Sequence, residues 1–342
     1  MKLDYALWEV TQRCNLQCLH CRADASPDKK EDNLIKGEDT QRLLRELKEL
    51  DCPILTLTGG EPLMRPDIVE IIAYASKIGL KIRIQSNSLL LTEKLANQLK
   101  DAGLVYYGVG LDGSKPEIND KIRNLPGAFN KAIENIKMLV AKGFRVHVEY
   151  TITKWNIDDI VPTLNLLEAL GIATFQARAA VFEGRAGQNK EEFILNLQDY
   201  QKALRIIAQE RKKRKGKIIV GCQDPLYHLV DEDLLAEIKN YGTDNKVRSG
   251  CTAGLNMIHI RVDGEIGVCT FLPITLGNFY QQSLKEIWEN KNSIKEIKQL
   301  CNRELTGKCR SCEDKFICAG CRARALEINH NLLGSDPYCF KK

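Results

Sequence analysis

Short β-rich runs alternate with amphipathic helical patterns from Tyr5 to about residue 180, and this alternation constrains the fold more than any other feature. It is typical of βα units arranged around a parallel sheet. Six runs read as strands: 6–11, 54–58, 81–86, 105–111, 146–151 and 173–179. The segments between them repeat apolar residues at intervals of three and four, as amphipathic helices do. We therefore expect an α/β fold built from six βα units.

The number of units predicts an open barrel. A closed parallel barrel needs eight units, so six should form a partial (β/α)6 barrel, with its chemistry at the C-terminal ends of the strands. A further helix is expected at 197–215 and would end a barrel domain spanning residues 1–215. Residues 216–250 are expected to form a linker, because 242–250 is polar and lacks periodicity.

The last part of the chain, residues 251–342, differs in composition from the rest. It holds eight of the thirteen cysteines, and Asp263-Gly264 between the runs 258–262 and 265–270 predicts a hairpin. We expect a small, cysteine-rich α+β domain here. A chain of 342 residues can bury a large core without disulfides, and an odd number of cysteines cannot pair completely. Metal ligation is therefore the leading interpretation of the cysteines.

Charge and hydropathy exclude several classes of partner. Residues 1–4 include an early acidic residue, and no apolar run is long enough for a signal peptide or a membrane span, so we expect a cytoplasmic protein without a membrane partner. The net charge of +5 is a small excess of 50 basic over 45 acidic residues. The basic run 211–215 lacks an aromatic or groove-reading motif and is interpreted as a solvated helix end, so no nucleic-acid partner is expected.

A loop with three cysteines follows the first strand directly. Cys14, Cys18 and Cys21 are spaced four and three residues apart. Three thiolates can bind three irons of a 4Fe-4S cube and leave the fourth iron open to a ligand that receives an electron. The alternative is a zinc site completed by His20 or by a distant residue, although no second pair of zinc ligands follows for 30 residues.

The second strand ends in a glycine-rich motif. Gly59, Gly60, Glu61 and Pro62 follow Thr58. Paired glycines allow a ligand to approach the backbone closely, and the carboxylate could receive an ammonium group. Taken alone, the motif is equally typical of an ordinary turn after a strand.

Together, the two motifs resemble those of the radical S-adenosylmethionine (SAM) superfamily, with His20 in the slot before the last cysteine that is usually aromatic. The resemblance implies that SAM chelates the open iron through its amino and carboxylate groups, and that Gly59, Gly60 and Glu61 hold the methionyl amine. It also implies that one electron cleaves SAM to methionine and a 5′-deoxyadenosyl radical. The electron would come from a partner such as ferredoxin or flavodoxin.

The superfamily places ribose contacts near the ends of the third to fifth strands. On this chain the resemblance assigns them to Ser86, Asn87, Asp112 and Arg123. Asp112 and Arg123 could equally form a structural ion pair.

The C-terminal cysteines resemble the SPASM domain, a radical SAM appendage that carries auxiliary 4Fe-4S clusters. One departure is the two-residue gap between Cys318 and Cys321, where the general pattern has three. The resemblance implies two auxiliary clusters besides the SAM-binding one. The first would be ligated by Cys309, Cys312, Cys318 and Cys339, and the second by Cys251, Cys269 and Cys321, with one iron lacking an assigned protein ligand.

Two questions about these cysteines stay open in the sequence. The spacing of Cys309, Cys312, Cys318 and Cys321 also fits a zinc ribbon. Cys222 or Cys301 could supply the missing ligand, but each reads better as a small buried hydrophobe, and Cys52 is expected to be structural.

Short motifs point to the haem and haem d1 biosynthesis branch of this group. They are 8–11 before Cys14, 21–23, 320–325 and 336–339. The resemblance implies a tetrapyrrole substrate, either iron-coproporphyrin whose propionates are oxidatively decarboxylated, a sirohaem derivative or the haem d1 precursor. Four arginines could pair with its carboxylates or lie on the surface: Arg178, Arg185, Arg322 and Arg324.

Two other classes of function remain. A peptide-modifying SPASM enzyme would act on a precursor peptide or a protein side chain, but such enzymes often carry an N-terminal peptide-binding domain, and here the first strand begins at about residue 6. A non-enzymatic iron–sulfur or zinc module would leave the motif at 59–62 without a purpose.

Overall fold

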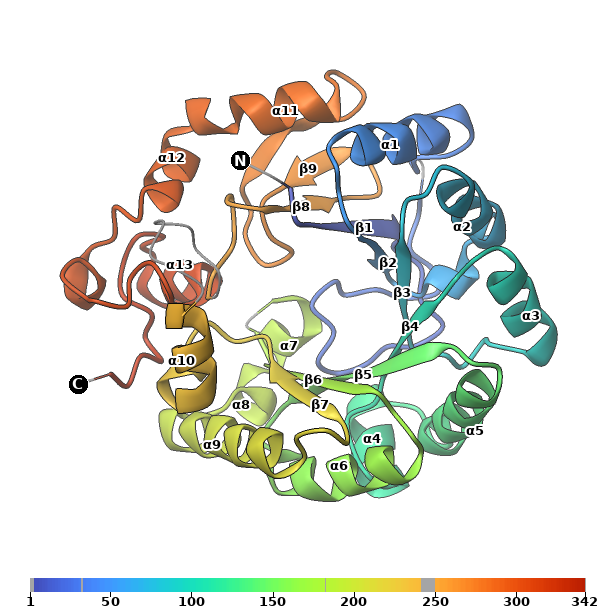
Figure 1. Cartoon of the computed structure of the whole chain (residues 1–342), viewed down its shortest axis with the longest axis horizontal. Helices are drawn as coiled ribbons and strands as arrows, with labels where there is room; N and C mark the ends of the chain where they lie inside the picture. The colour runs from blue at the N-terminus through green and yellow to red at the C-terminus, as the bar shows by residue number, and fades with distance from the viewer. Residues whose placement is uncertain (1–2, 32, 182, 241–249, 342) are drawn as a thin grey trace.

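A computed structural model describes residues 3–31, 33–181, 183–240 and 250–341. In these residues a single sheet of ten strands curves inside a layer of helices (Figure 1), in the order β10-β9-β8-β1-β2-β3-β4-β5-β6-β7. Neighbouring strands from β8 through β1 to β7 are parallel, whereas β8–β9 and β9–β10 are antiparallel. The α/β class with a parallel sheet is therefore confirmed.

The strands are β1 (Tyr5–Thr11), β2 (Leu55–Gly59), β3 (Ile82–Ser86), β4 (Tyr106–Gly110), β5 (Arg145–Ile152), β6 (Thr174–Ala179), β7 (Ile219–Cys222), β8 (Met257–Ile260), β9 (Glu265–Gly267) and β10 (Thr275–Asn278). The helices of the barrel are α1 (Glu38–Glu49), α2 (Ile68–Lys77), α3 (Glu93–Asp101), α4 (Pro116–Arg123), α5 (Ala128–Ala141), α6 (Ile160–Ala169), α7 (Gly184–Gln188), α8 (Lys190–Phe193) and α9 (Leu197–Lys213). The remaining helices are α10 (Glu232–Asn240), α11 (Leu284–Asn290), α12 (Lys295–Cys301) and α13 (Arg322–Asn329).

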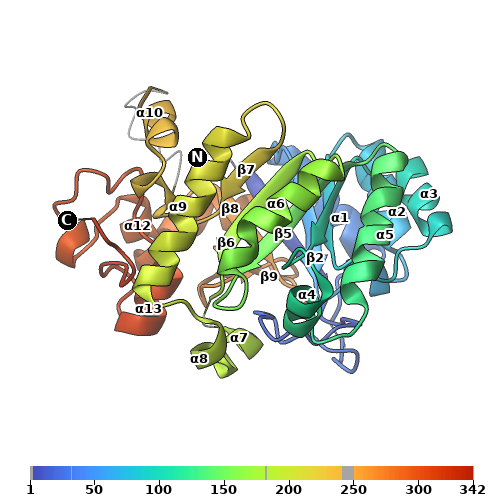
Figure 2. The ribbon, with the colours of Figure 1, turned by 90° about the horizontal axis from the view of Figure 1, so that it is seen from below.

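All six expected strands are present as β1 to β6, and two features of the sheet were not expected. A seventh parallel strand, β7, lies within 216–250, beside β6. The hairpin of the C-terminal region does not stand apart, because β8 pairs with β1 and extends the same sheet. The C-terminal segment therefore lies directly beside the start of the barrel, as Figure 2 shows from below. The expected irregular stretch at 242–250 lies outside the described residues except for Gly250.

The sheet separates an apolar outer face from a polar inner face. In β3, Ile82 and Ile84 belong to the main hydrophobic core, while Arg83 and Gln85 alternate with them and line a cavity inside the barrel. Successive side chains of a strand point to opposite faces, which explains the alternation. Closed parallel barrels fill their interior with branched apolar side chains. Here the polar interior leaves room for a ligand.

Helix ends are defined by local contacts. The Thr92 hydroxyl accepts a hydrogen bond from Leu95 N at the start of α3, and Ser283 and Glu286 form a capping box at the start of α11.

Within the described residues, no helix is both long and apolar enough to cross a membrane.

Candidate active site

The cysteine loop after β1 is held by backbone contacts from three other segments. Cys14 N donates to Ser26 O at 3.1 Å, and Leu19 N donates to Ile122 O at 3.0 Å. Cys14 and Cys18 are buried, and Cys21 is partly buried. Burial raises the pKa of the Cys14 thiol to about 12 and that of Cys18 to about 11. Deprotonation of these thiols therefore depends on a bound cation, as iron ligation supplies.

Arg185 clamps this loop from the N-terminal turn of α7. Its Nε donates to Cys18 O at 3.0 Å, and its two terminal nitrogens contact Asp24 at 2.7 Å and Ala25 O at 2.6 Å. Its own backbone N–H donates to Cys21 O at 2.9 Å. The sequence left open whether Arg185 pairs with a substrate carboxylate or lies on the surface; in the structure its guanidinium holds the cysteine loop instead.

The two glycines at the end of β2, Gly59 in the strand and Gly60 directly after it, lie against the exit of β1. A Cβ atom on Gly59 would lie 2.1 Å from Thr11 O, and one on Gly60 would lie 2.0 Å from Arg13 O. Gly60 N and Glu61 N donate to these same oxygens, at 2.7 and 2.8 Å. Glycine is required at these two positions because the backbones of the two loops pack too closely to admit a side chain. That packing fixes the turn beside the cysteine loop.

Glu61 is fully buried, and its carboxylate accepts three hydrogen bonds. The donors are Leu63 N at 3.0 Å, the Ser86 hydroxyl at 2.7 Å and Asn87 N at 2.7 Å. Burial nevertheless raises its pKa above the usual range. Pro62 begins the short 3-10 turn 62–64 that supplies Leu63. Glu61 therefore joins the ends of β2 and β3.

Asn87 links the end of β3 to the cysteine loop. Its side-chain nitrogen lies 2.8 Å from Asn15 Oδ1 and 3.8 Å from Cys14 Sγ. The structure thus brings together the cysteine loop, the motif at 59–62 and the predicted ribose contacts at the end of β3. Glu61 contacts Ser86 and Asn87, and Asn87 contacts Cys14.

Asp112 and Arg123 form the ion pair that the sequence left open, with a contact of 2.7 Å. His20 joins the pair, since its Nε2 lies 2.8 Å from the same carboxylate oxygen. Burial alone would raise the pKa of Asp112, but Arg123 and His20 outweigh it and lower that pKa to about 2. The histidine in the usually aromatic slot therefore ties the cysteine loop to the end of β4.

The C-terminal cysteines gather at two places. Cys309, Cys312, Cys318 and Cys339 line one small hollow, and Cys251, Cys269 and Cys321 line the wall of a larger cavity of about 450 Å³. These are the two ligand sets that the resemblance implies. In the described residues, no three acidic, cysteine or histidine side chains converge on a point suited to a single metal ion. A cube does not require such a point, because each thiolate binds its own iron.

The unassigned cysteines lie in different surroundings. Cys222 lines the larger cavity together with Cys251, Cys269 and Cys321. Cys301 contacts Gly254 O at 3.3 Å, and Cys52 is buried in the main core.

A polar cavity occupies the inside of the barrel, and sequence reasoning missed most of its charged lining. Arg22, Arg83 and Arg178 lie in its wall with Glu149. The alternation of apolar and polar residues in strand 81–86 was the signal that could have identified Arg83. This barrel cavity and the larger cavity adjoin, because Tyr5, Leu7, Arg83, Arg178, Gln223 and Thr270 line both. The two adjoining cavities, together called the hollow below, reach from the barrel interior to the auxiliary cysteines.

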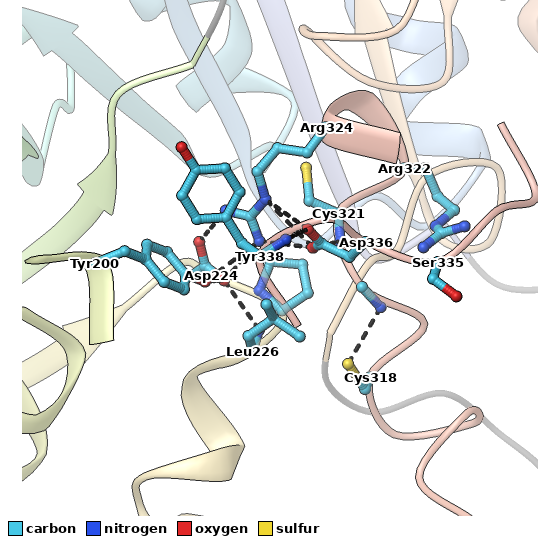
Figure 3. Close-up of polar contacts among 12 residues, drawn as sticks. Tyr200, Asp224, Leu226, Cys318, Cys321, Arg322, Arg324, Ser335, Asp336 and Tyr338 are labelled. Atoms are coloured by element: carbon cyan, nitrogen blue, oxygen red, sulfur yellow. Dashed lines mark hydrogen bonds and ion pairs between the residues drawn. The ribbon is translucent and has the colours of Figure 1, made fainter. Parts of the chain in front are cut away.

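Arg322 and Arg324 are also engaged by protein groups, and Figure 3 shows the contacts of Arg324. Arg324 is paired with Asp224 at 2.6 Å and Asp336 at 2.8 Å. Arg322 is fully buried and donates to Leu332 O at 3.0 Å and Gly334 O at 2.6 Å. Arg178, by contrast, lines the barrel cavity, where it contacts the neutral side chain of Gln223 and lies over the Phe271 ring.

Known proteins match the chain along nearly its whole length. Residues 8–167 match the radical SAM superfamily, and residues 251–313 match the SPASM iron–sulfur cluster-binding domain. The chain is 32% identical to an AdoMet-dependent heme synthase of Methanosarcina barkeri, with 97% of this chain and 95% of that protein covered. The chain belongs to the radical SAM superfamily. Its cofactors are accordingly SAM and a SAM-binding 4Fe-4S cluster, with auxiliary iron–sulfur clusters in the SPASM domain.

Two further proteins are similar to this radical SAM enzyme. A PqqA peptide cyclase of Ruegeria pomeroyi is 27% identical, over 98% of this chain and 86% of that protein. The SAM-bound crystal structure of Streptococcus suis SuiB superimposes with a TM-score of 0.81 at 17% identity, over 99% of this chain and 78% of that one. The second likeness shows the shared fold.

Proposed function

We propose that this radical SAM enzyme oxidatively modifies the carboxylate side chains of a tetrapyrrole, and that it decarboxylates propionates of iron-coproporphyrin. The observation that carries the proposal is that the barrel cavity adjoins the cavity lined by Cys251, Cys269 and Cys321, with Arg83 and Arg178 in the wall of both. The similarity to the heme synthase of Methanosarcina barkeri supports it.

The arginines give the hollow its preference for an anion. Guanidinium groups suit carboxylates because they donate two parallel hydrogen bonds. Arg83 and Arg178 stand on β3 and β6, so a carboxylate between them would be held from two sides of the barrel. Glu149 lies in the same wall, and burial raises its pKa above the usual range. Because burial disfavours the ionised form of Glu149, its repulsion of a substrate carboxylate is reduced.

The chain's residues would orient the substrate for hydrogen abstraction. The SAM-binding cluster, when loaded, supplies the electron that cleaves SAM to methionine and a 5′-deoxyadenosyl radical. Loss of a hydrogen atom from the propionate β-carbon, followed by loss of CO2 and one electron, leaves a vinyl group. Cys251, Cys269 and Cys321 lie in the wall of the adjoining cavity, where they would hold the auxiliary cluster that accepts this electron.

We further propose that Cys14, Cys18 and Cys21 ligate the SAM-binding cluster. Glu61, Ser86 and Asn87 would form the wall of the SAM site beside it. The enzyme would act in the cytoplasm, with ferredoxin or flavodoxin as its reductant. The contacts from Glu61 to Ser86 and Asn87, and from Asn87 to Cys14, support the common site.

A binding titration tests the substrate class. Anaerobic, iron-loaded protein is titrated with iron-coproporphyrin and, separately, with its tetramethyl ester, and the porphyrin absorbance is followed. We expect the acid to bind and the ester to bind at least tenfold more weakly, because a charge-assisted hydrogen bond contributes about 1.5–3 kcal/mol. Equal binding of acid and ester, or no binding of either, would contradict the proposal.

A peptide substrate is the second candidate, favoured by the similarity to a PqqA peptide cyclase. It would be supported if a peptide encoded beside this gene, and no tetrapyrrole, stimulated formation of 5′-deoxyadenosine.

A further inference from the structure

A buried charge network joins the barrel to the SPASM domain. Arg324 is the third residue of α13, a helix that begins directly after Cys321, and its guanidinium contacts two carboxylates. Asp224 follows β7, and Asp336 lies in the C-terminal segment (Figure 3). The side chains of Arg324, Asp224 and Asp336 are 7%, 3% and 0% exposed. Asp224, which precedes Arg324 by 100 residues, and Asp336, which follows it by 12, therefore meet at a single guanidinium.

Each carboxylate in the network is also held by neutral donors. Asp224 accepts hydrogen bonds from the Tyr200 hydroxyl at 2.6 Å and from Leu226 N at 2.9 Å. Asp336 accepts from Cys321 N at 2.6 Å and from Tyr338 N at 3.0 Å. Burial alone would raise the pKa of Asp224, but Arg324 outweighs it and lowers that pKa. The lowered pKa favours the ionised form of Asp224, and several hydrogen bonds hold both carboxylates in place.

The network carries one net negative charge beside a cysteine of the auxiliary site. Two carboxylates face one guanidinium, and Asp336 binds the backbone N–H of Cys321 directly. A buried ion pair is weak evidence for stability, because desolvation offsets its attraction. A fixed charge does act on a nearby iron–sulfur cluster, since net charge and hydrogen bonding set its reduction potential.

We propose that Arg324, Asp224 and Asp336 are positioning residues that set the reduction potential of the auxiliary centre containing Cys321, and hold it lower than a neutral network would. The proposal rests on the assignment of Cys321 as a ligand and is independent of the substrate. Because Asp224 belongs to the barrel and Asp336 to the SPASM domain, the potential depends on their docking.

The test changes charge and geometry separately. Asp224→Asn leaves the network neutral, whereas Arg324→Lys and the double variant Asp224→Asn/Arg324→Gln keep one net negative charge but alter the hydrogen bonds. The matched control is Glu210→Gln, because Glu210 is a buried partner of Arg214, which is likewise bound by a second carboxylate, Glu168. Each iron-loaded protein is titrated with reductant and followed by electron paramagnetic resonance, with iron content measured in parallel.

We expect Asp224→Asn to raise the midpoint potential of one auxiliary centre, and Arg324→Lys, the double variant and Glu210→Gln to leave it at the wild-type value. The signal of the SAM-binding cluster should not shift in any of them. An unchanged potential in Asp224→Asn with full iron content would overturn the proposal. A similar shift in all three network variants would also overturn it, because geometry and not charge would then be responsible. If Asp224→Asn loses its auxiliary iron, Tyr200→Phe is measured instead. This substitution removes a hydrogen bond to Asp224 and leaves the charge of the network unchanged. A shift of the midpoint potential in Tyr200→Phe would also count against the proposal.

Discussion

The imidazole of His20 lies 2.8 Å from the carboxylate of Asp112, and this contact connects the cysteine loop to the end of β4. The same carboxylate pairs with Arg123, which α4 presents from outside the loop. The cysteines are thus positioned by a buried charge network as well as by backbone hydrogen bonds.

Replacement of Asp112 should therefore destabilise the protein strongly. Asp112→Asn leaves Arg123 buried without its partner, and loss of one member of a buried pair costs about 3–5 kcal/mol. Urea unfolding of the iron-free protein measures the effect. The control is Asp158→Asn, because Asp158 pairs with Lys202 on the surface, where such pairs contribute about 0–1 kcal/mol. Equal effects of the two substitutions would contradict the buried network.

Glu61→Gln should weaken SAM binding without loss of iron. The substitution removes the carboxylate charge and turns an amide N–H2 group towards one of the donors Ser86 and Asn87. In the SAM site that the family resemblance implies, the carboxylate also receives the methionyl ammonium of SAM. Loss of that charge-assisted hydrogen bond costs about 1.5–3 kcal/mol, so affinity should fall roughly tenfold or more. Equilibrium dialysis with labelled SAM gives the affinity. Unchanged binding with full iron content would show that the 59–62 motif is only a turn.

Gly60→Ala should impair loading of the SAM-binding cluster. Its Cβ would lie 2.0 Å from Arg13 O, so one of the two loops has to move. Gly127→Ala is the control, because its φ of +85° is unfavourable but no atom lies within 4 Å of the added Cβ. We expect Gly127→Ala to cost about 1–2 kcal/mol and to retain full iron, whereas Gly60→Ala loses iron. The reverse order would argue against the packing of Gly60 on Arg13.

Arg83→Gln and Arg178→Gln should each weaken binding of iron-coproporphyrin about tenfold or more, because each removes one guanidinium from the barrel cavity. Arg145→Gln is the matched control, since Arg145 is an exposed arginine at the start of β5, stacked on Tyr106. Porphyrin absorbance titrations compare the three variants. If Arg145→Gln weakened binding as much, the loss would reflect overall charge and not the cavity.

Local patterns in the sequence were sufficient for β1 to β6 and for the three cysteines after β1, because each depends on periodicity or spacing over a few residues. β7 was missed because it is only four residues long and contains Gly221. The pairing of β8 with β1 joins residues about 250 positions apart, which no local pattern shows. The engagement of Arg185 and Arg324 depends on tertiary neighbours in the same way. Arg83 could have been found, since strand alternation already placed it opposite Ile82 and Ile84.

The central claim is that the hollow holds a tetrapyrrole so that its propionate reacts. The most direct measurement is anaerobic incubation of the iron-loaded enzyme with SAM, reductant and iron-coproporphyrin, followed by mass spectrometry of the porphyrin and quantification of 5′-deoxyadenosine. The account predicts one 5′-deoxyadenosine for each propionate that loses CO2, one hydrogen atom and one electron to become a vinyl group. Formation of 5′-deoxyadenosine while the porphyrin stays unchanged would contradict it.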